Sequence, residues 1–162
     1  MIPALTVRQP WAFGIVHGKT VENRSRAIKY RGPLWLHAGA RSRWDPAGGE
    51  SPLIRHAWTT FRAGLPESDV VLGRRTTLMP FGAIVALVDL VGCHPDNECE
   101  RPDGERPAFC SPWAAQWQWH WQLANIRVLD HPVIVRGALG LWRLPADVDE
   151  ACRKQLPELE AA

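Results

Sequence analysis

Short apolar stretches, separated by turn-forming residues, recur along most of this chain. In several of them apolar and polar positions alternate, which is the period of a β-strand. In one such stretch, for example, Leu34 and Leu36 would share one face of a strand and Trp35 the other. The pattern predicts strands at Leu5–Val7, Lys19–Ser25, Pro33–Ala38, Gly82–Val91, Trp117–Val128, Pro132–Val135 and Ala138–Leu144.

Two stretches have helical spacing instead. Pro10 suits the first position of a helix and Gly18 suits its end, so a helix is expected over Pro10–His17. Ser51–Pro52 precedes an amphipathic stretch that ends near Gly64. The long crossover helices of βαβ units are missing. The order of elements therefore predicts a small α+β domain: a curled, mostly antiparallel β-barrel with flanking helices.

Two further regions lack a strand pattern. Residues 92–112 are rich in Pro, Asp, Glu, Gly and Cys and are expected to form a long loop. Residues 147–162 carry several acids and predict an acidic C-terminal helix or tail. We therefore expect one main domain over residues 1–146, followed by this acidic segment.

Composition narrows the class of protein. The chain has 162 residues, of which 46% are hydrophobic and 22% charged, as in a globular domain. No apolar run approaches the roughly 18 residues of a membrane span, and no signal peptide is visible, so a cytoplasmic protein without membrane partners is expected. The net charge is only +2, but between Arg8 and Arg43 the sole acid is Glu22. A basic first third favours contact with phosphate.

The most chemically diverse stretch is Gly18–Ser25, which holds Lys19, Glu22 and Arg24 together with Asn23. In an extended chain Glu22 and Arg24 would share a face, with Lys19 at the mouth of the strand. An acid between two bases can keep its charge and orient both cations toward an anionic ligand. A surface strand with a solvated salt bridge explains the same pattern.

Other candidate binding residues lie near this stretch. Arg8 and Gln9 fall at a strand-to-helix junction, where free N–H groups attract anions, although an ordinary connection is the alternative. Tyr30 lies among cations and could stack on a base or cover the barrel rim. His37 follows a strand tryptophan and could be functional or simply packed and hydrogen-bonded.

The tryptophans near residue 120 also allow two interpretations. Trp117, Trp119 and Trp121 alternate with polar residues, so one strand face would carry three indoles. Such a face could stack on bases or fill the barrel core, and the core is favoured.

Four cysteines occur, at positions 93, 99, 110 and 152, and free thiols are expected in a cytosolic protein. Cys99 and Cys110, with Cys93–His94, could in principle bind zinc. Their spacing matches none of the common Cys-x2-Cys arrangements, so no metal and no cofactor is predicted.

Several motifs together resemble the ASCH domain family. They are Leu5-Thr6-Val7-Arg8-Gln9-Pro10-Trp11-Ala12, Gly18-Lys19 with Glu22-Asn23-Arg24-Ser25, Tyr30-Arg31-Gly32-Pro33-Leu34, Pro80-Phe81-Gly82-Ala83-Ile84-Val85, Trp121-Gln122-Leu123, and Arg136-Gly137 to Leu141-Trp142. The resemblance spans most of residues 4 to 145. It implies a barrel like that of pseudouridine synthase and archaeosine transglycosylase (PUA-like), assigned to residues 1–146.

The resemblance further implies that RNA, DNA or a modified nucleotide binds in a cleft beside the first helix. RNA is the favoured partner, and the oligomeric state is left open. The binding residues would be Arg8, Gln9, Trp11, Lys19, Glu22, Asn23, Arg24, Ser25, Tyr30 and His37.

Some relatives are enzymes, so the resemblance also implies an alternative. One branch hydrolyses acetylated cytidine nucleosides with a lysine and a threonine three residues later. Here Lys19 matches the lysine, but Glu22 stands in the threonine position, and Thr20 directly follows Lys19. Another relative is a ribonuclease, for which Lys19 and Glu22, with His37, would supply acid–base chemistry. The alternative is thus a small metal-independent hydrolase whose catalytic residues are Lys19 and Glu22.

Overall fold

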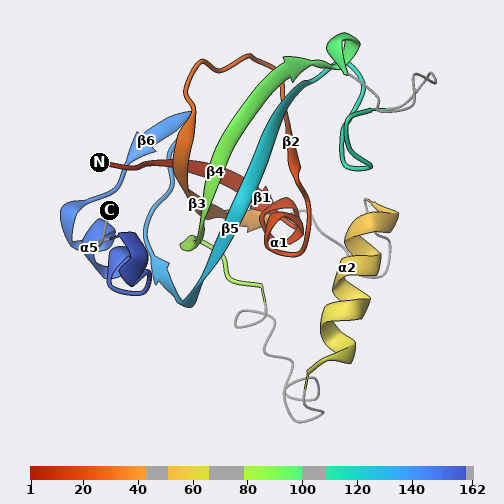
Figure 1. Ribbon diagram of the computed structural model, residues 1–162. Helices are drawn as coiled ribbons and strands as arrows, with labels where there is room; N and C mark the ends of the chain where they lie inside the picture. Colours follow the sequence, from red (N-terminus) through yellow and green to blue (C-terminus); the bar gives the residue numbers. More distant parts are fainter. Residues whose placement is uncertain (43–50, 66–78, 100–108, 160–162) are drawn as a thin grey trace.

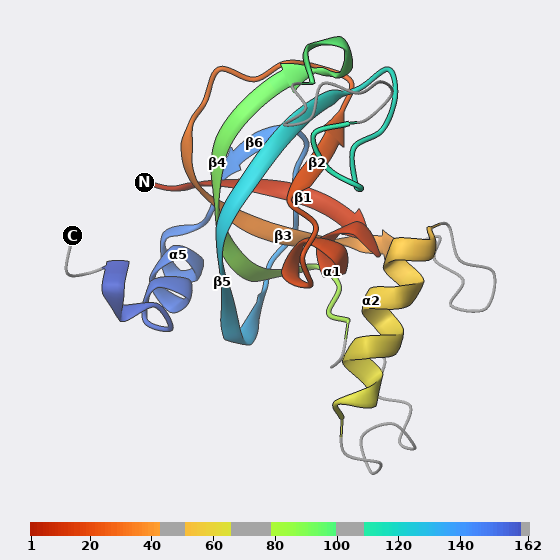
Figure 2. The same ribbon diagram turned by 45° about the vertical axis from the view of Figure 1, so that its right-hand side comes forward.

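In the described residues, the sheet has six strands in the order β2-β5-β4-β3-β1-β6 (Figure 1). The computed structural model describes residues 1–42, 51–65, 79–99 and 109–159. The strands are β1 Pro3–Gln9, β2 Val21–Arg24, β3 Gly32–Ser42, β4 Ala83–Pro95, β5 Trp119–Ile134 and β6 Leu141–Arg143. Figure 2 shows that the sheet curls into a half-barrel.

Antiparallel pairing dominates the sheet, as the sequence predicts. Only the β1–β3 pair is parallel among the described strands. Strands β2 and β6 stand at the two ends of the order. Arg24 on β2 nevertheless reaches β1, where its Nη2 donates to Thr6 O at 2.9 Å. No ladder of hydrogen bonds joins β1 and β2 among the described strands, and we call the line between them the seam.

The core lies on both faces of the curled sheet. One apolar cluster includes Leu34 and Leu36, and the other includes Trp35, as the alternation along β3 predicts. The first cluster is joined by buried residues of helix α1 (Trp11–Val16). The second cluster is completed by helix α5 (Ala146–Arg153). Each face of the sheet thus has its own helix.

The helices follow the expected boundaries closely. Helix α2 (Pro52–Ala63) begins after Ser51 and ends before Gly64. Its Ile54 is fully buried, and its aromatic residues pack on Phe13 of α1. No helix in the described part of the chain is long and apolar enough to cross a membrane.

The region after β4 differs from the sequence-based prediction. Residues 92–95, expected in a loop, extend strand β4, and the 3-10 turn η1 (Asp96–Glu98) follows them. The extension exists because β5 supplies partners as far as Trp119 opposite Pro95. The remainder of the predicted loop falls mainly on residues 100–108, which lie outside the described residues.

Strand β5 also differs from the sequence-based prediction. The stretches Trp117–Val128 and Pro132–Val135, expected as separate strands, belong mostly to one continuous strand. Trp117 lies outside that strand, has a positive φ of 61° and is 81% exposed, so the predicted three-indole face does not form. Trp121 is buried and joins the first core cluster. The core interpretation is therefore confirmed for Trp121.

The described part of the acidic segment, as far as Leu159, is folded onto the sheet. Residues Ala146–Arg153 form α5, and both Cys152 and Leu156 are buried in the second cluster. Trp35 Nε1 donates to Asp149 Oδ1 at 2.8 Å, which fixes the helix against β3. Of the two alternatives, a helix or a tail, the helix is present.

We expect the C-terminal segment to be part of one cooperative unit. Leu156→Ala should lower the free energy of unfolding by about 2–4 kcal/mol, because it opens a cavity in the second cluster. Leu139→Ala is the matched control: Leu139 is 98% exposed, and its loss should change stability by about 0.5 kcal/mol or less. Urea unfolding followed by tryptophan fluorescence measures both. Equal stabilities would show that the C-terminal segment unfolds independently.

Candidate functional site

A cavity of about 500 Å³ opens along the seam. It lies between β1, β2, the start of α1, the residues that begin α2 and a segment that precedes β5. Its lining residues are Thr6, Arg8, Trp11, Lys19, Glu22, Asn23, Arg24, Ser51, Leu53, Pro112, Trp113, Ala115, Gln116 and Gln118. We call this cavity the cleft, and residues 111–118 the wall segment.

The cleft contains a charged triad. Lys19 Nζ lies 2.5 Å from Glu22 Oε2, and Arg24 Nε lies 3.2 Å from Glu22 Oε1. Lys19 is only 1% exposed and Glu22 is also buried, whereas the Arg24 side chain is 30% exposed. The sequence-based prediction of an acid between two bases is therefore confirmed. The alternative, a solvated surface pair, does not fit this degree of burial.

The turn between α1 and β2 explains why Lys19 is buried. Gly18 has a φ of +103°, which favours glycine, and it reverses the chain after the helix. The Lys19 amide then donates to Gly14 O at 2.8 Å. A Cβ on Gly14 would stand 3.4 Å from Lys19 Cδ and 2.8 Å from Ile54 Cδ1. The small residue lets the lysine stem and helix α2 approach α1.

Two indole rings accompany the cations of the triad. Lys19 Nζ lies 5.9 Å from the centre of the Trp11 ring, and Arg24 Cζ lies 5.7 Å from that of Trp121. Such contacts attract a cation to the face of an aromatic ring. Trp121 is part of the first core cluster, and its Nε1 donates to Arg26 O. Trp11 lines the cleft and is the aromatic residue of α1 placed to meet a ligand.

Two opposing effects act on the pKa of Lys19. Burial lowers its pKa below the usual value, and the adjacent Glu22 carboxylate raises it in opposition. Burial is the larger effect, and the nearby Arg24 lowers the pKa slightly further. Glu22 is therefore the residue that favours the protonated form of Lys19.

Asn23, one of the predicted binding residues, bonds to the wall segment through both atoms of its side-chain amide. Its amide Nδ2 donates to Trp113 O at 2.8 Å, and its Oδ1 accepts from Ala115 N at 2.9 Å. The side chain thus fastens the wall segment to β2, although Asn23 still lines the cleft. Sequence reasoning missed the wall segment, since the two partners of Asn23 lie about 90 residues away along the chain.

The remaining predicted binding residues fall into two groups. Arg8 is exposed and lines the cleft. Gln9 is buried away from the cleft: its Oε1 accepts from Phe13 N, and its Nε2 donates to Pro80 O, both at 2.9 Å. It caps α1 and ties this helix to the chain before β4. The position of Gln9 at a helix start is confirmed, but its bonds are structural.

Ser25, Tyr30 and His37 do not line the cleft. Ser25 is exposed beyond the end of β2. The Tyr30 hydroxyl donates to Pro33 O at 2.7 Å, and its ring packs against the first core cluster. His37 is 1% exposed on β3, its Nε2 lies 3.0 Å from Val135 O, and burial lowers its pKa. These positions favour the packing interpretations of Tyr30 and His37.

A second group of polar side chains lies near the outer ends of β4 and β5. The structure brings together the ligand atoms of His94, Cys99, Cys110 and His120, all within 4.8 Å of one another. The prediction of no metal rested on spacing along the chain, which did not include His120. This group is considered further below.

The fold and the cleft together define a PUA-like module of the α+β class. The family model of the ASCH domain matches residues 5–133. Because this range covers most of the chain, the protein belongs to the ASCH domain family. No curated protein compared with the chain matches it. Membership of the family is consistent with a nucleic-acid-binding module.

We expect Glu22 to determine whether Lys19 can remain buried and charged. Glu22→Gln should lower the free energy of unfolding at neutral pH by roughly 3 kcal/mol, because an unpaired ammonium stays buried. The substitution also lowers the pKa of Lys19 further below its ordinary 10.5. The lowered pKa belongs to Lys19 in the folded state, and the ordinary pKa of 10.5 to Lys19 in the unfolded state. At pH values between the two, the folded state binds fewer protons than the unfolded state. The free energy of unfolding of the variant should therefore rise with pH across this interval.

Urea unfolding across neutral and alkaline pH tests this expectation. Lys19→Met/Glu22→Gln is the matched control, since it removes both charges and should lack the steeper rise with pH. Wild-type stability for Glu22→Gln at neutral pH would contradict the dependence of Lys19 on Glu22.

Proposed function

We propose that this protein is an RNA-binding module that seats one unstacked nucleotide, ordinary or modified, in the cleft. Membership of the ASCH family and the cationic lining of the cleft carry the proposal. Arg8, Lys19 and Arg24 outnumber the single acid Glu22 among the charged lining residues. A cavity of about 500 Å³ suits a small-molecule-sized group rather than a duplex.

The lining offers a partner for each part of a nucleotide. Arg8 is exposed at the rim and supplies a guanidinium for phosphate. Trp11 offers an aromatic face for the base, as in single-strand recognition. Gln116 and Gln118 contribute side-chain amides, which can both donate to and accept from a base edge. The triad supplies positive charge without exposing a flexible lysine.

Arg8→Ala should weaken binding of short single-stranded RNA by a similar factor for different sequences. It should also reduce the slope of log K against log salt by about 1, because one phosphate contact is lost. Fluorescence anisotropy of labelled RNA and DNA oligonucleotides over a salt series measures both effects. Wild type should bind RNA more tightly than DNA of the same sequence.

Arg143→Ala is the control for this experiment. Arg143 is also an exposed arginine, but it lies on β6 outside the cleft. The control removes the same charge and should leave the affinity and the salt slope close to wild type. If both variants lost affinity equally, RNA would be held by overall charge and the cleft would not be its site.

Hydrolysis is the second candidate function, and the buried Lys19–Glu22 pair favours it. A lysine with a lowered pKa beside a carboxylate in a cavity is a typical acid–base arrangement. The substrate would be an RNA phosphodiester or an acylated cytidine. Thr20 does not line the cleft, and its hydroxyl lies 3.3 Å from that of Ser111. A threonine nucleophile is therefore not part of this candidate.

If the protein is a hydrolase, Lys19→Met/Glu22→Gln should abolish turnover while the protein remains folded. RNA oligonucleotides run on a gel, and acetylated cytidine followed by chromatography, are the two assays. Arg143→Ala should retain full activity. Intact substrates with wild-type protein that still binds RNA would reject hydrolysis and leave the binding proposal standing. Cleavage that persists in the double variant would exclude this pair as its catalyst.

A further inference from the structure

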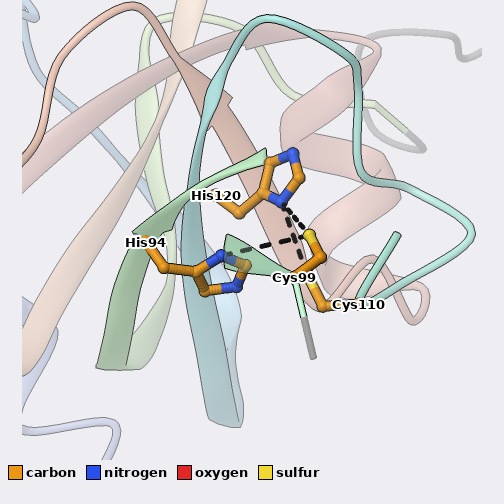
Figure 3. Close-up of side chains that lie close together, drawn as sticks. All are labelled: His94, Cys99, Cys110 and His120. Atoms are coloured by element: carbon orange, nitrogen blue, oxygen red, sulfur yellow. Dashed lines mark hydrogen bonds between the residues drawn. The ribbon is translucent and has the colours of Figure 1, made fainter. Parts of the chain in front are cut away.

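Four side chains with metal-binding atoms converge where β4 ends and β5 begins. Figure 3 shows that His94, Cys99, Cys110 and His120 point toward one centre. Their ligand atoms all lie within 4.8 Å of one another. We propose that this group is a structural zinc site with two thiolate and two imidazole ligands.

The distances fit a tetrahedral ion. Bonds of about 2.0–2.3 Å to zinc place the four ligand atoms roughly 3.3–3.8 Å apart. His120 Nδ1 lies 3.1 Å from Cys99 Sγ and 3.5 Å from Cys110 Sγ, and His94 Nδ1 lies 4.0 Å from Cys99 Sγ. Small shifts of these side chains therefore complete the coordination.

His120 is held in the orientation that a ligand needs. It is 0% exposed, and its Nε2 lies 2.9 Å from Ala115 O, to which a ring N–H can donate. With the proton on Nε2, the Nδ1 lone pair faces both sulfurs. A backbone carbonyl that fixes the second nitrogen is the usual support of a histidine bound to metal.

The sheet itself brings the two histidines together. His94 and His120 are direct partners in the β4–β5 register, with ring centres 5.2 Å apart. The turn η1 then returns the chain, and the Cys99 amide donates to Asp96 O at 3.3 Å. Cys110 lies directly before the wall segment. The four ligands thus come from two strand ends and the connection between them.

Four protein ligands and soft sulfur donors favour zinc in a structural role. On binding, each thiol gives up its proton to solvent, so two protons leave for each zinc ion. His94 Nδ1 also lies 2.9 Å from Pro95 O. Zinc binding through this nitrogen moves the ring proton to Nε2 and replaces that contact.

The site would hold the wall segment of the cleft in place. This segment runs between the ligands Cys110 and His120, and Ala115 O contacts His120. The same residue donates its N–H to Asn23 on β2. Zinc at one end and Asn23 on β2 would then fix the segment from two sides.

Metal analysis of the full chain, purified without a histidine tag and under reducing conditions, tests the site. We expect one zinc ion per chain in wild type and its loss in Cys99→Ser and Cys110→Ser. Cobalt added to metal-free wild type should give the visible bands of a tetrahedral site and a thiolate charge-transfer band in the near ultraviolet. Cys99→Ser should weaken both signals.

Cys93→Ala is the matched control. Cys93 lies beside His94 on β4 but packs against the first core cluster and is not part of the group. This variant should keep one zinc ion and the cobalt spectrum. Zinc that survives in Cys99→Ser, or no zinc and no cobalt spectrum in folded wild type, would overturn the proposal. A mass lower by two hydrogens, with no metal, would show a Cys99–Cys110 disulfide instead.

A local readout separates a bound structural ion from a surface ion. Chelation of zinc should lower the melting temperature of wild type and of Cys93→Ala, but not that of Cys99→Ser. Hydrogen exchange should accelerate at the Ala115 amide and its neighbours after chelation, while the β3 amides change little. Unchanged exchange across residues 111–118 in a protein that has lost its zinc would contradict the structural role.

Discussion

The pairing of Glu22 with two cations is the constraint on which the cleft depends. Removing an ammonium from water costs several kcal/mol unless a partner compensates. Lys19 is almost completely buried and Glu22 lies 2.5 Å from it, so each is needed for the burial of the other. Arg24 contacts the same carboxylate and also donates to Thr6 O across the seam. The Glu22 carboxylate therefore links the residue that follows α1 to β2 and, through Arg24, to β1 across the seam.

Local sequence was enough to predict this triad because its members are close along the chain. Lys19 and Glu22 are three residues apart, and period 2 places Arg24 on the same face as Glu22. Periodicity likewise predicted the two faces of β3 and both early helices. These features depend on residues that are close along the chain, whose relative positions follow from the period of a strand or a helix.

Features that depend on distant contacts could not be predicted in this way. The partners of Asn23 on the wall segment lie about 90 residues away. Gln9 was predicted to bind a ligand beside the free N–H groups of a helix start, yet its Nε2 donates to Pro80 O, 71 residues further on. Cys99 and Cys110 lack the spacing of a zinc finger. The β4–β5 register, rather than a short loop, brings His120 opposite His94 and so near the two cysteines.

Binding and hydrolysis require opposite properties of the same lysine. A residue that attracts phosphate must keep its proton, which the carboxylate of Glu22 and the Trp11 ring favour. A general base must lose the proton near neutral pH, which burial favours, and burial is the larger effect on the pKa of Lys19. A ligand phosphate in the cleft would add negative charge beside Lys19 and shift this balance toward the protonated form. A bound phosphate therefore favours the protonated form of Lys19, whereas burial in the cleft opposes that form.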